Sequence, residues 1–116
     1  MATLLVAVGG VLGVLARYGA GRAAPEAGIW GTVAINVAGS FLLGLLVAGA
    51  WFSRDVRDGL GIGFLGGFTT FSTFSVHVVQ ALDASEPGRA AGYAVASVLG
   101  GIAAAAAGYA LGRQLA

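Results

Sequence analysis

Four long apolar runs follow one another along the chain, at residues 3–22, 29–52, 59–82 and 90–112. Each has about the 20 residues that an α-helix needs to cross the hydrocarbon core of a bilayer. The segments between them are short, and two of these segments contain a proline. We therefore predict an all-α membrane protein with four transmembrane helices in a single domain, residues 1–116.

The third run is interrupted near its middle. Its segment Gly66–Ser75 begins with two glycines and continues with a mixture of hydroxyl residues and phenylalanines. In hydrocarbon every backbone N–H and C=O group needs a partner, so irregular backbone persists only where protein buries it or water reaches it. We therefore predict that the third helix is broken at membrane depth, which indicates an ion or solute pathway.

The composition agrees with a membrane protein and excludes other functions. Hydrophobic residues make up 58% of the chain and charged residues 9%, far from the values of soluble domains. The net charge of +1 gives no indication of a nucleic-acid partner. The chain has no cysteine, and all its carboxylates lie outside the apolar runs. Since no nucleophile–base pair or carboxylate dyad is present either, we do not expect an enzyme.

The arginines divide evenly between the two ends of a four-helix unit. Three accompany the termini and three lie at the opposite end: Arg54, Arg57 and Arg113 against Arg17, Arg22 and Arg89. An excess of Lys and Arg on one side normally fixes the orientation. The even division leaves both a single orientation and insertion in both orientations open, and insertion in both permits an antiparallel dimer.

The N-terminal run raises the alternative of a signal peptide. It lacks a preceding Lys or Arg, and its apolar character continues to Arg17. Signal peptides have a basic start and a shorter apolar core. We therefore interpret this run as a retained first transmembrane helix.

The last run carries a ridge of small residues. They recur at every fourth position: Gly92, Ala96, Gly100, Ala104, Gly108 and Gly112. This spacing lets membrane helices approach closely. The ridge predicts close helix packing, within one subunit or with another. Because four helices of this size enclose little interior, we expect a pathway to need a second copy.

Several polar and aromatic side chains lie within the apolar runs. Asn36 either forms a structural bond between helices or lines an ion pathway, and we favour the pathway. Phe71 and Phe74 are three residues apart, which suits core packing or two ring edges facing an anion. Ser72 and Thr73 supply hydroxyl donors beside them.

Four further residues are candidates. Arg17 suits either an anchor at the membrane surface or an electropositive vestibule. Tyr93 and Ser97 are spaced i, i+4 and share a helix face, where they line a pathway or bond neighbouring helices. His77 is the only histidine, so it forms no metal site, and the simplest expectation is a hydrogen-bonded side chain.

Three motifs in this order along the chain carry a family resemblance. They are Gly-Gly-x-x-Gly followed by Ala16-Arg17-Tyr18, then Gly31-Thr32 with Asn36-x-x-Gly39-Ser40-Phe41, and finally the segment Gly63–Ser75. Together they closely resemble the bacterial fluoride channel family, Fluc or CrcB. The similarity extends over the whole chain, and the third motif is highly specific for that family.

This resemblance implies a fluoride-selective channel in the plasma (inner) membrane of a bacterium. Such a channel exports fluoride passively and confers fluoride resistance. The resemblance also implies an antiparallel, dual-topology homodimer with two pores, each lined by both subunits. A structural sodium ion (Na⁺) would lie at the dimer interface, held by the backbone carbonyls of Gly66 and Thr69 from each subunit.

The resemblance further assigns the fluoride pathway and its mouth. The positions that match the pathway are Asn36, Phe71, Phe74, Ser72, Thr73, Tyr93 and Ser97, and Arg17 matches the arginine of the aqueous vestibule. His77 departs from the pattern, because family members often carry glutamate there. Since histidine changes charge near neutral pH, this departure leaves open a pH-dependent conductance, or a chain that forms one half of a heterodimer.

Two alternatives to the homodimeric channel remain: one subunit of a heterodimeric fluoride channel, and a small membrane exporter of another class. Proton-coupled exporters typically need a carboxylate inside the membrane, and the apolar runs contain none. A third class, a non-conducting membrane scaffold, predicts that Asn36→Asp or Phe71→Ile leaves any ion flux untouched.

Overall fold

The computed structural model describes all residues 1–116 and contains only helices. In chain order these are α1 (Ala2–Ala23), the 3₁₀ turn η1 (Pro25–Ala27), α2 (Ile29–Ala48), α3 (Arg54–Asp58), the π-helix η2 (Gly59–Leu65), α4 (Gly66–Phe68), α5 (Phe71–Asp83) and α6 (Pro87–Leu115). By length and composition, α1, α2, α6 and the segment Arg54–Asp83 are each able to cross a membrane. This confirms the prediction of an all-α protein with four apolar helices.

The connection between the second and third spans differs from the prediction at both of its ends. Helix α2 ends at Ala48 rather than at Phe52, because Gly49 is extended (φ −78°, ψ 145°). The segment 54–58, predicted as a connection, forms α3 at the start of the third span. The Ser53 side chain accepts a hydrogen bond from a backbone N–H in its first turn (3.5 Å), which caps the helix.

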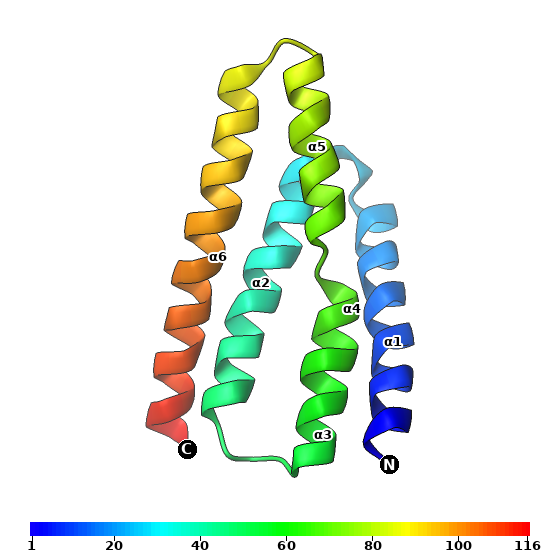
Figure 1. The fold of residues 1–116 in the computed structure, drawn as a ribbon, viewed down its shortest axis with the longest axis vertical. Coiled ribbons are helices and arrows are strands. Elements are labelled where there is room, and N and C mark those ends of the chain that lie inside the picture. Colours follow the sequence, from blue (N-terminus) through cyan, green and yellow to red (C-terminus); the bar gives the residue numbers. More distant parts are fainter.

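The third span changes its packing partner along its length. Its first part, η2 and α4, packs on α1, whereas its second part, α5, packs on α6. Helix α2 also packs extensively on α6. Figure 1 shows both termini at the same end of the molecule as α3, with the α5–α6 turn at the opposite end. The four spans therefore run alternately up and down, as short connections require.

Glycines bring α1 into backbone contact with the first part of the third span. A Cβ atom added at Gly13 would collide with the carbonyl oxygen of Phe64. Conversely, a Cβ at Gly67 would lie 2.6 Å from the carbonyl oxygen of Gly10. These helices approach so closely because neither carries a side chain at the crossing, as in other small-residue contacts between membrane helices.

The predicted ridge on α6 meets the backbone of α2 in its C-terminal part, whereas at Gly100 it meets only the side chain of Val37. A Cβ at Gly108 would collide with the carbonyl oxygen of Phe41, and one at Gly112 would lie 2.7 Å from that of Leu45. A Cβ at Gly92 would meet nothing within 4 Å. The reason is geometric, because a repeat of four residues drifts around a helix that has 3.6 residues per turn.

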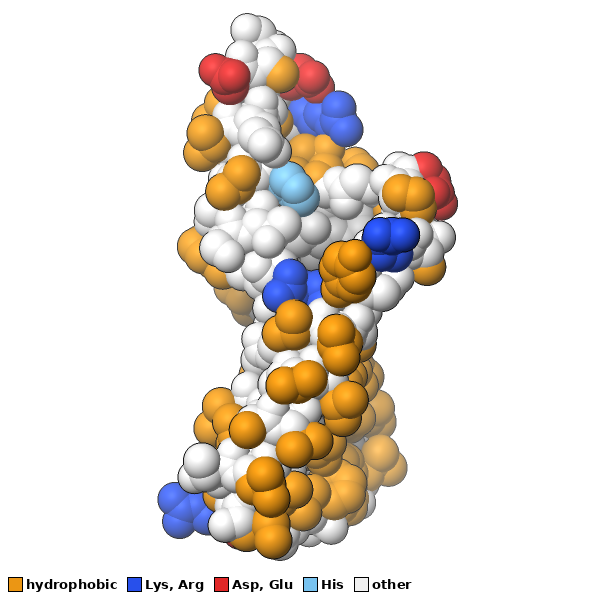
Figure 2. Space-filling model, turned by 90° about the vertical axis from the view of Figure 1, so that its right-hand side faces the viewer, with side chains coloured by type: hydrophobic (Ala, Val, Ile, Leu, Met, Phe, Trp, Pro, Cys, Tyr) orange, Lys and Arg blue, Asp and Glu red, His pale blue; other side chains and the backbone are white.

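The single chain buries little of its apolar surface. Only 16 of its 116 residues are buried, so most large hydrophobic side chains face outward. Figure 2 shows them covering much of the lower half of one face. A compact core forms only towards the α5–α6 turn, from Ile29, Phe74, Ala81, Ala90 and Tyr93. The outward surface suits lipid or another chain rather than water.

Candidate functional site

The third span has two extended residues between α4 and α5. The N–H of Thr69 still donates to the carbonyl of Leu65 (3.0 Å), which is the last bond of the first part. Thr69 (φ −89°, ψ 158°) and Thr70 (φ −152°, ψ 118°) are extended, and α5 begins at Phe71. Extended residues cannot continue the N–H(i)→O=C(i−4) ladder of a helix, so backbone groups on both sides need other partners.

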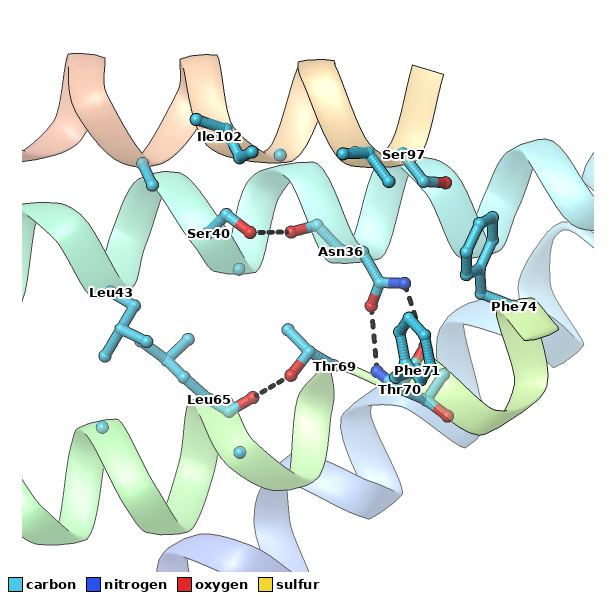
Figure 3. Close-up of a pocket in the computed structure, with 16 residues that line it drawn as sticks. Asn36, Ser40, Leu43, Leu65, Thr69, Thr70, Phe71, Phe74, Ser97 and Ile102 are labelled. Carbon is cyan, nitrogen blue, oxygen red and sulfur yellow. Dashed lines mark hydrogen bonds between the residues drawn. The ribbon is translucent and has the colours of Figure 1, made fainter. Parts of the chain in front are cut away.

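Asn36 of α2 binds both backbone groups of Thr70. Its Oδ1 accepts a hydrogen bond from the Thr70 N–H (2.9 Å), and its Nδ2 donates to the Thr70 carbonyl (3.0 Å), as Figure 3 shows. A side-chain amide carries a donor and an acceptor on two neighbouring atoms, as this arrangement requires. Asn36 therefore makes the structural bond between helices that the sequence left open, and it makes this bond at the interrupted segment.

Thr70 also caps α5. Its Oγ1 accepts a hydrogen bond from the Thr73 N–H (3.3 Å) and donates to the Thr73 Oγ1 (3.1 Å). Threonine is a favoured N-cap residue because its hydroxyl satisfies such an N–H. Thr70 is not among the site residues predicted from the sequence. A threonine placed directly before a helical run is the signal that identifies it.

Arg17 of α1 reaches the other side of the break. Its Nε donates to the carbonyl of Gly67 (3.1 Å), in the last turn before the extended residues. In a continuous helix that carbonyl would bind the N–H of Phe71, which here lies beyond the two extended residues. A cation at the C-terminal end of a helix also interacts favourably with the helix dipole.

The carbonyls of Gly66 and Thr69 lack their helical donors. The Thr70 N–H, which would bind the Gly66 carbonyl in a continuous helix, is bound to Asn36 instead. The Thr73 N–H, which would bind the Thr69 carbonyl, is bound to the Thr70 hydroxyl. Carbonyl oxygens of this kind suit hard cations. By contrast, no cluster of His, Cys, Asp or Glu side chains is present that could hold a metal ion.

A groove of about 460 Å³ lies beside the break. Its lining contains no charged residue and includes several predicted site residues: Asn36, Gly66, Thr69, Phe71, Phe74 and Ser97. Figure 3 shows Asn36, Thr69 and Ser97 among them, from α2, the third span and α6. The Oγ of Ser97 is buried and has no hydrogen-bond partner. The groove therefore offers hydroxyl and amide groups at an apolar surface without a fixed charge.

The two phenylalanines of the groove differ in exposure. Phe74 is 7% exposed and belongs to the core, whereas Phe71 is 78% exposed. Their ring centroids lie 5.9 Å apart with an angle of 57° between the planes. Both line the groove as the sequence predicts, but only Phe74 is enclosed by its own subunit.

A second cavity, of about 530 Å³, joins other predicted residues. Arg17, Thr73 and His77 line it together with Thr70, which also lines the groove. His77 makes no hydrogen bond, contrary to the simplest expectation, and its Nδ1 is buried without a partner. Figure 2 shows the single histidine, in pale blue, in a hollow of the surface.

Tyr93 and Ser72 lie outside the groove. The Tyr93 ring is buried and packs edge-on against Trp30, with 4.7 Å between the ring centroids, and its hydroxyl accepts a hydrogen bond from Arg89. Of the i, i+4 pair on α6, only Ser97 therefore reaches the groove. Ser72 is exposed, with its Oγ 3.4 Å from the hydroxyl of Thr70.

Comparison with known proteins matches residues 4–109 to the family described as CrcB-like protein, Camphor Resistance (CrcB). A protein of Novosphingobium aromaticivorans named fluoride-specific ion channel FluC is 45% identical over 112 residues, which cover 87% of each chain. A protein of that name from Agrobacterium fabrum is 45% identical over 119 residues, covering 96% of this chain and 95% of the relative. One from Thermus thermophilus is 44% identical over 120 residues, covering 97% and 94%. This chain belongs to the CrcB family.

Proposed function

We propose that this protein is a fluoride-selective channel in the plasma membrane of a bacterium, and not an enzyme. It lets fluoride leave the cytoplasm down its electrochemical gradient. The observation that carries this proposal is the uncharged groove at the break, where an amide, hydroxyls and aromatic rings meet. The relatives of similar length that are named fluoride-specific ion channels agree with it.

The chemistry of the groove suits a small, strongly hydrated anion. A pore must replace the water around such an ion with hydrogen-bond donors and still release it. Asn36 keeps one of its two N–H groups free of the contact with Thr70, and the hydroxyl of Ser97 has no partner within the subunit. The positive edges of the Phe71 and Phe74 rings add weak attraction. A fixed positive charge would bind fluoride more strongly and retain it.

The conducting unit that we propose is an antiparallel homodimer with two pores. The groove is open, and Phe71 beside it is 78% exposed, so one subunit alone encloses no pathway. The even division of arginines between the two ends is compatible with insertion in both orientations. Each groove would then be closed by the second copy.

We propose that a sodium ion binds at the break where two copies meet. The carbonyls of Gly66 and Thr69 support this proposal, because their helical donors are bound elsewhere. A monovalent cation bound by carbonyls would compensate their partial negative charges inside the membrane. We assign no step of fluoride movement to this ion.

The remaining predicted residues take different parts in this proposal. Arg17, Thr73 and His77 line a vestibule that concentrates anions before they enter the groove. Ser72 is an exposed donor beside them. Tyr93 has a supporting role, because its ring is buried and its hydroxyl is already bound to Arg89.

Fluoride efflux from liposomes tests the function. The purified chain is reconstituted alone, and an ion-selective electrode follows fluoride, with chloride-loaded and protein-free liposomes as controls. We expect rapid fluoride efflux, no chloride efflux and strongly reduced fluoride efflux with Phe71→Ile. Efflux that requires an opposing proton gradient would indicate an exporter. No efflux from folded protein would contradict the homodimer and lead to a search for a partner subunit.

A further inference from the structure

We infer that Asn36, the Thr70 hydroxyl and Arg17 are positioning residues that prevent the third span from closing into a continuous helix. By doing so they keep the carbonyls of Gly66 and Thr69 available to a cation. This inference rests on the proposed sodium site, and it concerns how the chain builds that site. None of the three side chains needs to touch the cation itself.

The inference begins with the competing structure. If residues 69 and 70 became helical, the Thr70 N–H would bind the Gly66 carbonyl, and the Thr73 N–H would bind the Thr69 carbonyl. In a membrane this competitor is strong, because unpaired backbone groups are costly there. It would use the two carbonyls that the proposed cation requires.

Two contacts divert the donors that the competing helix needs. Asn36 binds the Thr70 N–H (2.9 Å), which removes the donor for Gly66. The Thr70 hydroxyl binds the Thr73 N–H (3.3 Å), which removes the donor for Thr69. Asn36 also donates to the Thr70 carbonyl (3.0 Å), so it satisfies that whole residue in its extended conformation.

The third contact satisfies the carbonyl of Gly67, one of the two carbonyls that lie between Gly66 and Thr69 in the chain. The Gly67 carbonyl has no helical donor, because the chain is extended after Phe68. Arg17 of α1 donates a hydrogen bond to this carbonyl instead (3.1 Å). The Arg17 guanidinium thus binds one carbonyl of this turn and leaves Gly66 to other partners. Arg17, which lines the vestibule, therefore also stabilises the extended conformation at the break.

Matched variants distinguish this role from direct contact with fluoride. Thr70→Val removes the hydroxyl at nearly constant size, and Thr70→Ser restores it. Asn36→Asp still accepts from the Thr70 N–H but can no longer donate to the Thr70 carbonyl. Ser97→Ala removes a groove hydroxyl that has no partner, and it serves as the control for damage to the pathway alone.

The measurement is the melting temperature of the purified, detergent-solubilised protein as Na⁺ replaces N-methylglucamine at constant ionic strength. A ligand that binds only the folded state raises this temperature by an amount that grows with the logarithm of its concentration relative to its Kd. We expect Thr70→Val and Asn36→Asp to move the Na⁺ midpoint about tenfold higher, the size of one lost hydrogen bond. Thr70→Ser and Ser97→Ala should keep the wild-type midpoint, although Ser97→Ala slows fluoride efflux.

Two results would overturn the inference. One is an unchanged Na⁺ midpoint in folded Thr70→Val and Asn36→Asp. The other is a wild-type protein whose melting temperature does not respond to Na⁺ at all. Neither result depends on fluoride efflux, so failure of this inference is distinct from failure of the proposed channel. If Asn36→Asp does not fold, the Thr70→Val and Thr70→Ser pair decides the question.

Discussion

The two halves of the third span are held in place by different means. The first half, η2 and α4, has glycines at five of its ten positions and packs on α1 by backbone contact. The second half, α5, has no glycine and packs on α6 through side chains such as Phe74 and Ala81. A single transmembrane span thus contacts its neighbouring helix through backbone atoms in one half and through side chains in the other.

This difference explains why the candidate site lies at the junction. Carbonyl groups become accessible where glycines remove side chains, and hydroxyl and aromatic groups become available where the helix resumes with a polar, aromatic turn. The junction at Thr69 and Thr70 brings both kinds of group to one groove. Substitutions in the first half should therefore act through steric exclusion, and those in the second half through side-chain chemistry.

The largest effect is expected from a bulky residue at the glycine crossing. Gly13→Leu places a side chain where even a Cβ atom collides with the backbone carbonyl of Phe64, which cannot move aside as a side-chain end can. Overpacking typically costs about 1–3 kcal/mol, and more where backbone must shift. We expect loss of folded protein in size-exclusion chromatography and a large fall in melting temperature. Gly21→Ala, on the same helix with nothing within 4 Å, is the control.

The phenylalanine pair of α5 separates stability from function. Phe74→Ala should lower the free energy of unfolding by an amount approaching the ~3–5 kcal/mol known for buried aromatic residues, because this ring is 7% exposed. Phe71→Ala should leave the stability of the subunit nearly unchanged, since its ring is 78% exposed, and yet reduce fluoride efflux. Thermal unfolding and liposome efflux measure the two properties. Equal destabilisation by both variants would contradict the assignment.

The charge at position 77 tests the side-chain chemistry of α5. The charged groups that face His77 across its two cavities are Arg17 from α1 and Glu86 and Arg89 at the start of α6. Glu86 forms an ion pair with Arg89 (3.2 Å). A cation at position 77 would add positive charge to a vestibule that attracts anions.

We therefore expect His77→Lys to raise fluoride efflux a few-fold and His77→Glu to lower it, both measured at one pH. His77→Gln is the uncharged control. Protein-free liposomes correct for passage of neutral hydrogen fluoride. Equal efflux in His77→Lys and His77→Glu would contradict an electrostatic part for this position.

The smallest effect is expected at a glycine of η2 that does not touch a neighbouring backbone. A Cβ at Gly61 would lie 3.3 Å from the end of the Leu46 side chain and 3.4 Å from that of Leu43, and both ends are able to move. Gly61→Ala should therefore cause no loss of stability. A marked fall in its melting temperature would show that the steric requirement extends along the whole first half of the span.

Much of the architecture follows from the sequence because hydropathy and helix-breaking residues act locally. Four apolar runs of sufficient length predict four helices, and paired glycines followed by hydroxyl residues predict an unusual third span. Ser53 also gives a local signal, because a serine directly before Arg54-Asp55 is typical of a helix start. The prediction of a connection over these residues overlooked that signal. The end of α2 lies four residues before Phe52, and Gly49 is the one local signal for it.

Most of the polar groups of the site can be predicted from the sequence, whereas the tertiary structure decides which of them reach the groove and which bind one another. Asn36 and Thr70 are 34 residues apart, and Arg17 and Gly67 are 50 apart. No periodicity predicts such pairs, because they depend on which helices pack together and at which height. The same packing encloses Phe74, leaves Phe71 exposed and removes Tyr93 from the groove, although these residues look equivalent in the sequence.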